Sequence, residues 1–464
     1  MRCELSEAVH NNTVEFKRLL TLAAPLIVNN LALAGMGLAD TLMSGYISAE
    51  AQAAVGVGSS VWMLFFLFAL GTLMAISPIS STHRGAGRGH LIGRYARQGF
   101  WLSLIISAIA VTTMVFVAVP GLAVIGIDPT VRPLAAGYLL AIVCGAPFGF
   151  AYLTLRYTTE GIGWTRPVMF VSVSALPVNV LANYVLMFGK WGAPELGAVG
   201  AGYGSALTMV FMCIALLVYM VRSPRYAPYA IFSLGRGPRW AEMREILALG
   251  VPIMVSILAE AGLFGGVTLL MGKLSAQIAA GHIIAMNYAS TMFMIPMGLN
   301  SATTILVSNA LGRGELSLAR ARGYLGIVSC GLFMSVSAAG LLLFRETVVG
   351  WYTQDPAVFE VAISLLLVAA VFQVSDGIQV GAAGALRGLH DTRVPMFLTF
   401  FSYWIIGFPL AYAAALPLAL PPPMIWSGFV VGLSVAAVLL VLRFRQVSRQ
   451  RDRVSKVADT ALVD

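Results

Sequence analysis

Long apolar runs separated by short polar connections occupy nearly the whole chain. A membrane-spanning helix needs about 20 mostly apolar residues, and twelve runs in this sequence qualify. The predicted spans lie at residues 19–44, 52–78, 98–126, 134–155, 167–189, 196–221, 247–271, 279–307, 323–344, 358–384, 395–416 and 423–442. This pattern predicts an all-α integral membrane protein with twelve transmembrane helices.

Composition excludes the soluble alternatives. Of the 464 residues, 59% are hydrophobic and 11% are charged, whereas soluble domains average about 45–50% and 25%. So few charges cannot cover the surface of a soluble fold of this size. Disordered and nucleic-acid-binding chains are excluded for the same reason, although the net charge is +9. The partner that this composition predicts is the lipid bilayer.

The basic residues predict the orientation, because Lys and Arg favour cytoplasmic loops. Placing the N-terminus in the cytoplasm puts 25 of the 29 Lys and Arg residues on the cytoplasmic side. The four that remain outside are Arg132, Lys190, Lys273 and Arg345. We therefore expect both termini in the cytoplasm, where the basic tail faces anionic lipid. A nucleic-acid partner for this tail is not expected.

An internal repeat divides the chain into two halves. A shift of 227 residues superimposes several identical pairs: Pro25 on Pro252, Thr41-Leu42 on Thr268-Leu269, Gly45 on Gly272, Ser48-Ala49 on Ser275-Ala276, and Thr165-Arg166 on Thr392-Arg393. Each half holds an even number of spans, so both enter the membrane from the same side. This predicts two six-helix bundles related by a pseudo-two-fold axis along the membrane normal, with a cleft between them that suits alternating access.

The predicted organisation follows from the spans, the repeat and the charges. It comprises a cytoplasmic N-terminus (1–18), an N-lobe (19–221), a cytoplasmic linker (222–246), a C-lobe (247–442) and a basic cytoplasmic tail (443–464).

Three carboxylates fall inside predicted spans: Asp40, Glu260 and Asp376. No Lys or Arg lies in the middle of any predicted span, so these acids lack a basic partner at that depth. An unpaired acid in a membrane costs about 2.5–3.5 kcal/mol on the insertion scale and marks a functional site by default. Either a bound proton or a cation can neutralise the charge. The alternative is a purely structural role, in which the acid bonds polar groups on a neighbouring helix.

Helical rise places the acids at two depths. Glu260 lies 13 residues from Leu247, about 20 Å, and Asp376 lies 11 residues from Arg387, about 16 Å. These two acids could therefore share one ion or one proton. Asp40 lies 22 residues from Arg18, about 33 Å, in the outer half of its span.

Two amides are candidate partners of Asp40. Asn179 and Asn183 stand four residues apart and share one helical face. They could ligate a cation or assist Asp40, and ordinary hydrogen bonding between helices is an equal alternative.

Two sets of residues resemble a known transporter family. Ala39-Asp40-Thr41, followed by Gly45 and by Ala53-Ala54-Val55-Gly56, is similar to the first-span signature of the multidrug and toxic compound extrusion (MATE) transporters. Glu260, Asp376 and the segment 384–395, which reads GALRGLHDTRVP, resemble the NorM branch of that family. The resemblance extends over residues 15–445.

The resemblance implies a transporter that exports organic cations, such as drugs and dyes, by antiport with H+ or Na+. It implies a cation site, with Na+ as the metal, at Glu260 and Asp376, and a second coupling residue at Asp40. It implies a substrate-clamping acid at Asp355. Two positions depart from the family pattern: Asn183 stands where an acid is frequent, and Phe372 replaces an aromatic hydroxyl one turn before Asp376. The second departure argues against the simplest Na+ geometry.

The family also implies a monomer in the bacterial inner membrane, with no cofactor besides the transported ions. The first rival is a flippase for a lipid-linked or amphiphilic substrate, which would need a basic cleft that the spans do not supply. The second is a membrane-embedded enzyme, but no HExxH, DDxxD or P-loop motif is present. The third is a channel, and a cleft between repeats favours alternating access instead.

Overall fold

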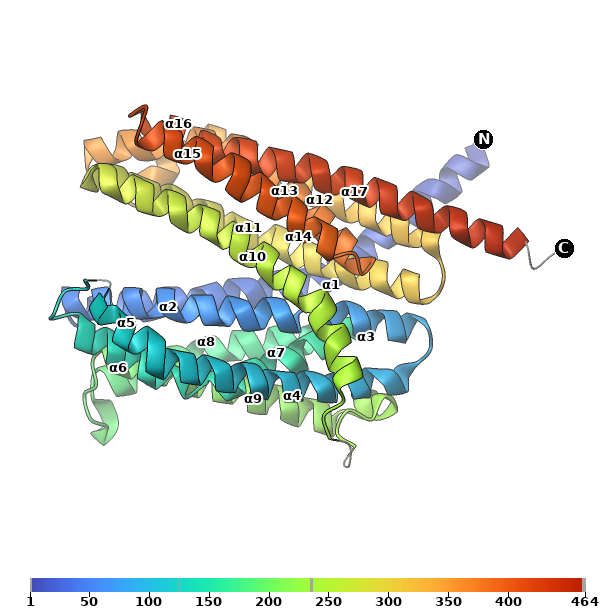
Figure 1. Cartoon of the computed structure of the whole chain (residues 1–464), viewed down its shortest axis with the longest axis horizontal. Helices are drawn as coiled ribbons and strands as arrows, with labels where there is room; N and C mark the ends of the chain where they lie inside the picture. Colours follow the sequence, from blue (N-terminus) through green and yellow to red (C-terminus); the bar gives the residue numbers. More distant parts are fainter. Residues whose placement is uncertain (1, 125, 234–236, 461–464) are drawn as a thin grey trace. The chain divides into compact units, whose positions relative to one another are not determined.

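The computed structural model describes the backbone of residues 2–124, 126–233 and 237–460, and the side chains of 13–124, 126–233 and 237–450. Every regular element in these ranges is a helix (Figure 1). Within these described residues, eleven helices are long and apolar enough to span a membrane, and the pair α6 and α7, bent by 48° at a short break, would form a twelfth. The predicted all-α membrane fold is confirmed.

The helices follow the predicted spans closely. The first half contains α1 (Arg2–Gly45), α2 (Ala49–Leu73), α3 (Ile76–Gly85), α4 (Gly89–Thr113), the π-helix η1 (Met114–Ala118), α5 (Val119–Val124), α6 (Arg132–Val143), α7 (Ala146–Gly161), α8 (Arg166–Met187), the short 3-10 helix η2 (Lys190–Gly192), α9 (Ala198–Arg222) and the 3-10 helix η3 (Pro224–Tyr229). The second half contains α10 (Trp240–Leu274), α11 (Ala276–Gly312), α12 (Leu316–Gly350), α13 (Pro356–Gly388), α14 (Arg393–Phe400), the π-helix η4 (Phe401–Gly407), α15 (Phe408–Ala415), α16 (Pro422–Ile425) and α17 (Ser427–Thr460).

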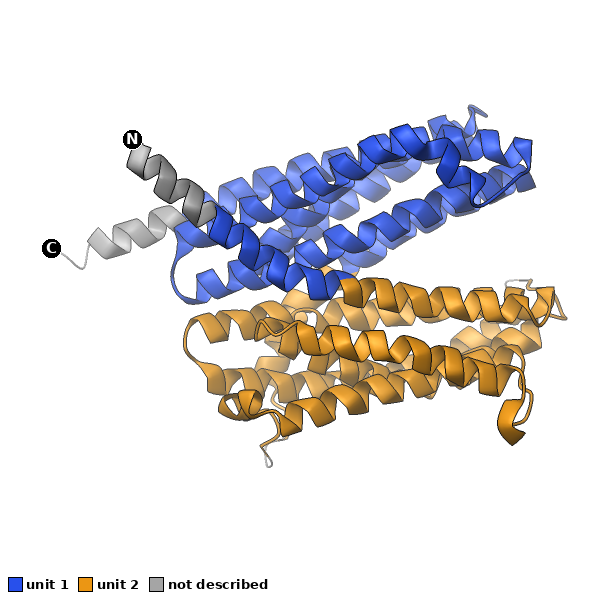
Figure 2. Cartoon of the chain, turned by 180° about the vertical axis from the view of Figure 1, so that it is seen from behind, with its two compact units in different colours: residues 1–27, 255–464 blue, residues 28–254 orange. Residues whose placement is uncertain are grey.

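The chain forms two compact units, which Figure 2 colours separately. Unit 1 consists of Met1–Ile27 and Val255–Asp464, and unit 2 consists of Val28–Met254. This division differs from the lobes expected at 19–221 and 247–442, because the first part of α1 groups with the second half and the first part of α10 with the first half. The expected linker 222–246 also contains η3 and the start of α10. Apolar runs show where spans begin, whereas packing decides which unit a helix segment joins.

The two crossing segments pack in equivalent ways. Within unit 1, Ile27 lies against Gly298, where an added Cβ would come within 2.4 Å of the Ile27 side chain. Within unit 2, Met254 lies against Gly71, where an added Cβ would come within 2.5 Å of the Met254 Cα. Both pairs are related by the 227-residue shift. The glycines therefore allow a helix to approach at the same place in each repeat.

Helix caps repeat as well. Ser48 caps α2 by accepting a hydrogen bond from the Ala51 N–H at 3.0 Å, and Ser275 caps α11 by accepting one from the Ile278 N–H at 3.2 Å. Both serines are extended, as a residue that caps a helix N-terminus must be. Because they align in the repeat, the sequence identity at these positions reflects a shared local structure.

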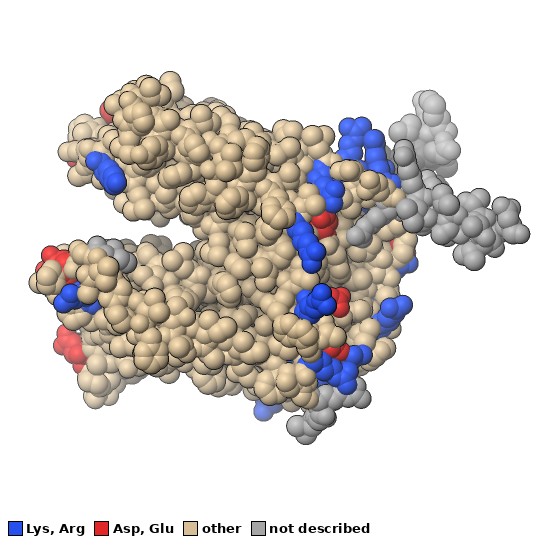
Figure 3. Space-filling view, viewed as in Figure 1, with Lys and Arg blue, Asp and Glu red and all other residues tan. Residues whose placement is uncertain are grey.

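Basic side chains concentrate near one end of each unit. On the face shown in Figure 3, most Lys and Arg side chains lie there, and the middle of the helices is almost free of charge. Some charges that the sequence assigned to connections lie inside helices instead. Arg156 and Glu160 are both buried in α7, where the Arg156 Nε donates to Glu160 at 2.7 Å. A pair spaced four residues apart neutralises itself on one helix face.

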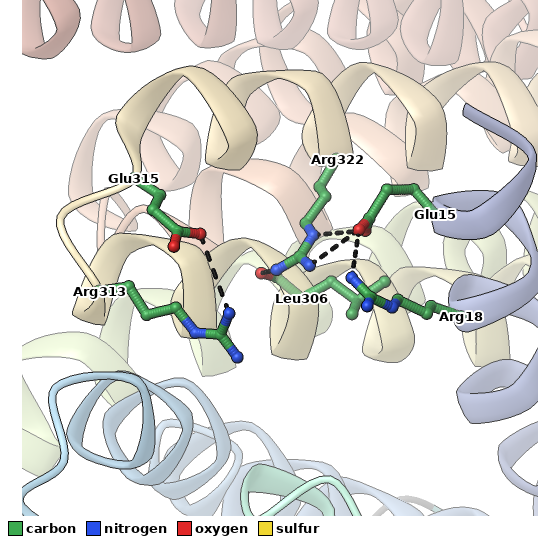
Figure 4. A network of polar contacts seen from close by, with 6 residues as sticks. All are labelled: Glu15, Arg18, Leu306, Arg313, Glu315 and Arg322. Atoms are coloured by element: carbon green, nitrogen blue, oxygen red, sulfur yellow. Dashed lines mark hydrogen bonds and ion pairs between the residues drawn. The ribbon is translucent and has the colours of Figure 1, made fainter. Parts of the chain in front are cut away.

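A second buried ion pair holds the N-terminal part of α1 in unit 1 (Figure 4). The Arg322 guanidinium on α12 donates from Nε to Glu15 Oε2 at 2.7 Å and from Nη2 to Glu15 Oε1 at 3.2 Å. Its Nη1 donates to the Leu306 carbonyl at 3.1 Å. Arg322 is 3% exposed, so this two-pronged bond is shielded from solvent. Apolar contacts of Leu19, Ala23 and Leu26 with α11 extend the same packing.

Removing Glu15 should therefore destabilise unit 1. Glu15→Ala leaves the buried Arg322 without its carboxylate partner, which typically costs about 3–5 kcal/mol. The matched control is Glu315→Ala, since Glu315 forms a 4.0 Å pair with Arg313 whose side chains are both exposed, and such pairs contribute about 0–1 kcal/mol. Thermal unfolding in detergent should show a clear fall in Tm for Glu15→Ala alone. Equal losses in the two variants would contradict the role given to the buried pair.

Candidate functional site

Unit 1 brings together two of the three acids predicted from the sequence. Glu260 lies on α10 and Asp376 on α13, close enough for their charges to interact. Asp376 is 4% exposed, and its Oδ1 has no hydrogen-bond partner among the described residues. The side-chain amide of Gln379, one turn further along α13, hydrogen-bonds Glu260. Two carboxylates thus lie within electrostatic reach of each other in an apolar unit, and a neutral side chain bonds one of them.

Positive charge acts on this pair electrostatically, without a direct ion pair among the described residues. No ion pair joins Glu260 or Asp376 to a Lys or Arg in the described part of the chain. Arg387 is the basic residue whose charge reaches Glu260, from the last turn of α13. It lies 11 residues after Asp376, roughly 16 Å along the helix. Two nearby carboxylates that form no ion pair with a basic residue favour uptake of a proton or a cation.

Asp40 occupies a separate site within unit 2. The carboxylate accepts a hydrogen bond from Asn183 Nδ2 at 2.5 Å and another from Ser205 Oγ at 2.8 Å. Asn179 also hydrogen-bonds it, so both amides predicted from the α8 face contact the acid. Asp40 is buried, and all three partners are neutral donors. These hydrogen bonds offset part of the cost of burying a carboxylate, and no second acid contacts Asp40 in the described part of the chain.

Asp355 does not join either cluster. It precedes α13 and caps that helix, since its Oδ1 accepts a hydrogen bond from the Ala357 N–H at 2.9 Å. Asp376 lies 21 residues further along the same helix, roughly 31 Å away by helical rise. The exposed side chain of Asp355 thus has a structural role at the helix end, and its predicted contact with substrate stays a prediction.

Sequence reasoning missed four residues at these sites. Tyr403 and Gln379 lie beside the acids of unit 1, and Ser205 and Tyr138 lie beside Asp40 in unit 2. A neutral polar residue in an apolar run carries little signal, because most such residues bond their own helix. Ser205 and Tyr403 come from spans other than those of the acids, so no spacing pattern connects them.

Two segments of the chain match the model of a known protein family. The MatE family model matches residues 25–185 and 252–413. The chain belongs to the MatE family. The two matched segments begin 227 residues apart (252 − 25), so this MatE match also reproduces the internal repeat.

Relatives of this MatE chain cover it almost completely. It is 42% identical to NorM of Xanthomonas axonopodis pv. citri over 92% of this chain and 93% of that protein. It is 37% identical to the multidrug resistance protein PmpM of Pseudomonas aeruginosa over 95% and 94%, and 37% identical to the multidrug resistance protein MdtK of Yersinia pseudotuberculosis over 94% and 96%. The resemblance to the NorM branch is thereby confirmed.

Solved structures share the MatE fold. An outward-facing multidrug resistance MATE transporter of the MOP superfamily superimposes with a TM-score of 0.87 at 20% identity, covering 95% of this chain and 97% of that one. The eukaryotic MATE transporter AtDTX14 gives a TM-score of 0.84 at 20% identity over 96% and 99%. These similarities support the fold of the chain.

Ser205 gives a direct test of the Asp40 site. Ser205→Ala removes the donor to Asp40 Oδ2 and should destabilise unit 2 by about 1–3 kcal/mol, because a charged acceptor loses a buried hydrogen bond. The matched control is Ser174→Ala, an exposed serine on α8 whose hydroxyl donates to the Phe170 carbonyl. Thermal unfolding in detergent should separate the two variants. A Tm for Ser205→Ala equal to that of the control would contradict the contact.

Proposed function

We propose that this chain is a secondary-active multidrug efflux transporter that exports organic cations in exchange for H+ or Na+. One observation carries the proposal: Glu260 and Asp376 lie within electrostatic reach of each other inside an apolar unit, and neither forms an ion pair with a Lys or Arg among the described residues. Keeping two charged carboxylates in such a place is costly. A mobile cation lowers that cost when it binds, and it can leave again when the site opens to water.

The names of the relatives support the choice of substrate. PmpM and MdtK are described as multidrug resistance proteins, and each is 37% identical to this chain along most of its length. In such a transporter the ion gradient supplies the driving force. The drug site therefore does not need to be highly specific, which suits a multidrug substrate spectrum. Alternating access couples drug export to ion import. The protein takes up the drug when it is open to one side of the membrane and the ion when it is open to the other.

The two units offer different sites for the coupling ions. Asp40 accepts hydrogen bonds from three neutral donors, and no second acid contacts it among the described residues. One proton is enough to neutralise a single buried carboxylate, and no second negative charge is present there to hold a metal ion. Glu260 and Asp376 together supply two negative charges, which suit Na+. We therefore assign the proton to Asp40 and the Na+ to the Glu260–Asp376 pair.

The proposed location is the bacterial inner membrane, with both termini in the cytoplasm. The 25 basic residues on one side support this orientation, because they would face the anionic inner leaflet. The basic tail (443–464) belongs to the same side.

Neutralising either acid of the pair should abolish Na+-driven export. In proteoliposomes loaded with a fluorescent organic cation, Glu260→Gln and Asp376→Asn should each stop efflux under an imposed Na+ gradient. The double variant should lose little more, because each single change already breaks the shared site. The matched control is Glu360→Gln, which removes an exposed charge from α13, the helix that carries Asp376. Partial losses that add up would show that the acids act separately.

Asp40→Asn should have a different effect. Efflux driven by a pH gradient should fall sharply, while Na+ binding measured by calorimetry should persist, because the proposed Na+ site lies in unit 1. Asp128→Asn, an exposed change in unit 2, is the control. Loss of Na+ binding in Asp40→Asn, combined with its survival in Glu260→Gln, would reverse the assignment of the two ions.

A further inference from the structure

Unpartnered oxygens gather beside the acids of unit 1. The Tyr403 side chain is fully buried, and its hydroxyl has no hydrogen-bond partner among the described residues. The Gln379 carbonyl oxygen and Asp376 Oδ1 share this property in the same part of the structure. Tyr403 lies beside Gln379 and within electrostatic reach of Glu260 and Asp376. Two helices, α13 and η4, therefore place three unpartnered oxygen atoms close to the acids of unit 1.

Leaving these oxygens unpaired is unfavourable. Almost all buried polar atoms in folded proteins have a partner, and an exception calls for an explanation such as a missing ion. The hydrocarbon core of a membrane offers no bulk water that could replace the partner. Each of these oxygens offers a lone pair. A single cation would therefore satisfy them together.

The backbone that carries Tyr403 is unusual. Tyr403 lies in η4, a π-helix of seven residues between α14 and α15. A π-helical turn contains an extra residue, which rotates the following side chains relative to an α-helix, and such turns are frequent at functional sites. At its end, Gly407 packs against Gly428 and Gly432 of α17, where an added Cβ would lie 3.0 Å from the Gly428 carbonyl oxygen. This contact between backbones fixes the segment that positions the Tyr403 ring.

We propose that the Tyr403 hydroxyl and the Gln379 side-chain oxygen complete an all-oxygen site for a dehydrated Na+ ion with Glu260 and Asp376. The phenol can place a lone pair on the ion while its O–H donates to a carboxylate oxygen such as Asp376 Oδ1. Neutral oxygens replace the water that Na+ loses on entering an apolar unit. This inference rests on the proposed ion coupling and adds the residues that would distinguish Na+ from a proton.

The decisive variant is Tyr403→Phe, which removes one oxygen and retains the ring. If the hydroxyl is a ligand, Na+ affinity measured by calorimetry should fall by about tenfold or more, and the rise in Tm caused by Na+ should shrink accordingly. The Tm without Na+ should stay equal or rise, because an unpartnered buried hydroxyl is gone. Gln379→Leu should likewise weaken Na+ binding. The matched control is Tyr152→Phe, a buried tyrosine of unit 2 whose hydroxyl bonds Ser172.

Each outcome decides one of the two proposals. Unchanged Na+ affinity in Tyr403→Phe would overturn the ligand role of the hydroxyl. The absence of any Na+ binding by the unaltered protein would also overturn the ligand role. If Glu260→Gln then lost proton-driven efflux, the proposed exporter would still stand. Efflux that survives in Glu260→Gln, Asp376→Asn and Asp40→Asn would instead refute the proposed ion coupling.

Discussion

The hydrocarbon core of a membrane contains no water, so every polar atom placed there must find its partner within the protein. This constraint explains the composition of the chain and the few polar residues that its spans contain. Each buried polar group in this structure therefore has a reason to be there. Groups that have partners stabilise the fold, and a cluster of unpartnered oxygens beside two acids is where the proposed cation would bind.

The two acid sites differ in this respect. Asp40 receives hydrogen bonds from Asn179, Asn183 and Ser205, so its carboxylate is satisfied by its own unit. Asp376 retains an unpartnered oxygen beside Glu260 and Tyr403. The two repeats thus share a fold and differ in their polar content. In the proposed exporter, this difference allows one unit to handle a proton and the other a larger cation.

Equivalent residues of the two repeats meet where helices pack closely. The pairs Gly71–Met254 and Gly298–Ile27 occupy equivalent positions, and each allows a crossing helix to approach a neighbouring one. The compact units separate directly after these contacts, at Ile27 and Met254. Packing at these places depends on small residues, and a repeat can retain them while its polar residues diverge.

The sequence by itself determined the number of spans, the repeat and the three acids inside the spans, because each of these leaves a signal along the chain. Apolar runs of about 20 residues predict helices, and an isolated Asp or Glu stands out within them. Spacing on one helix also predicted that Asn179 and Asn183 share a face. Only the tertiary structure decided that Glu15 pairs with Arg322, that α10 joins both units, and that Ser205 and Tyr403 lie beside the acids. These contacts join helices far apart in the sequence, and no local pattern encodes which faces of two distant helices meet.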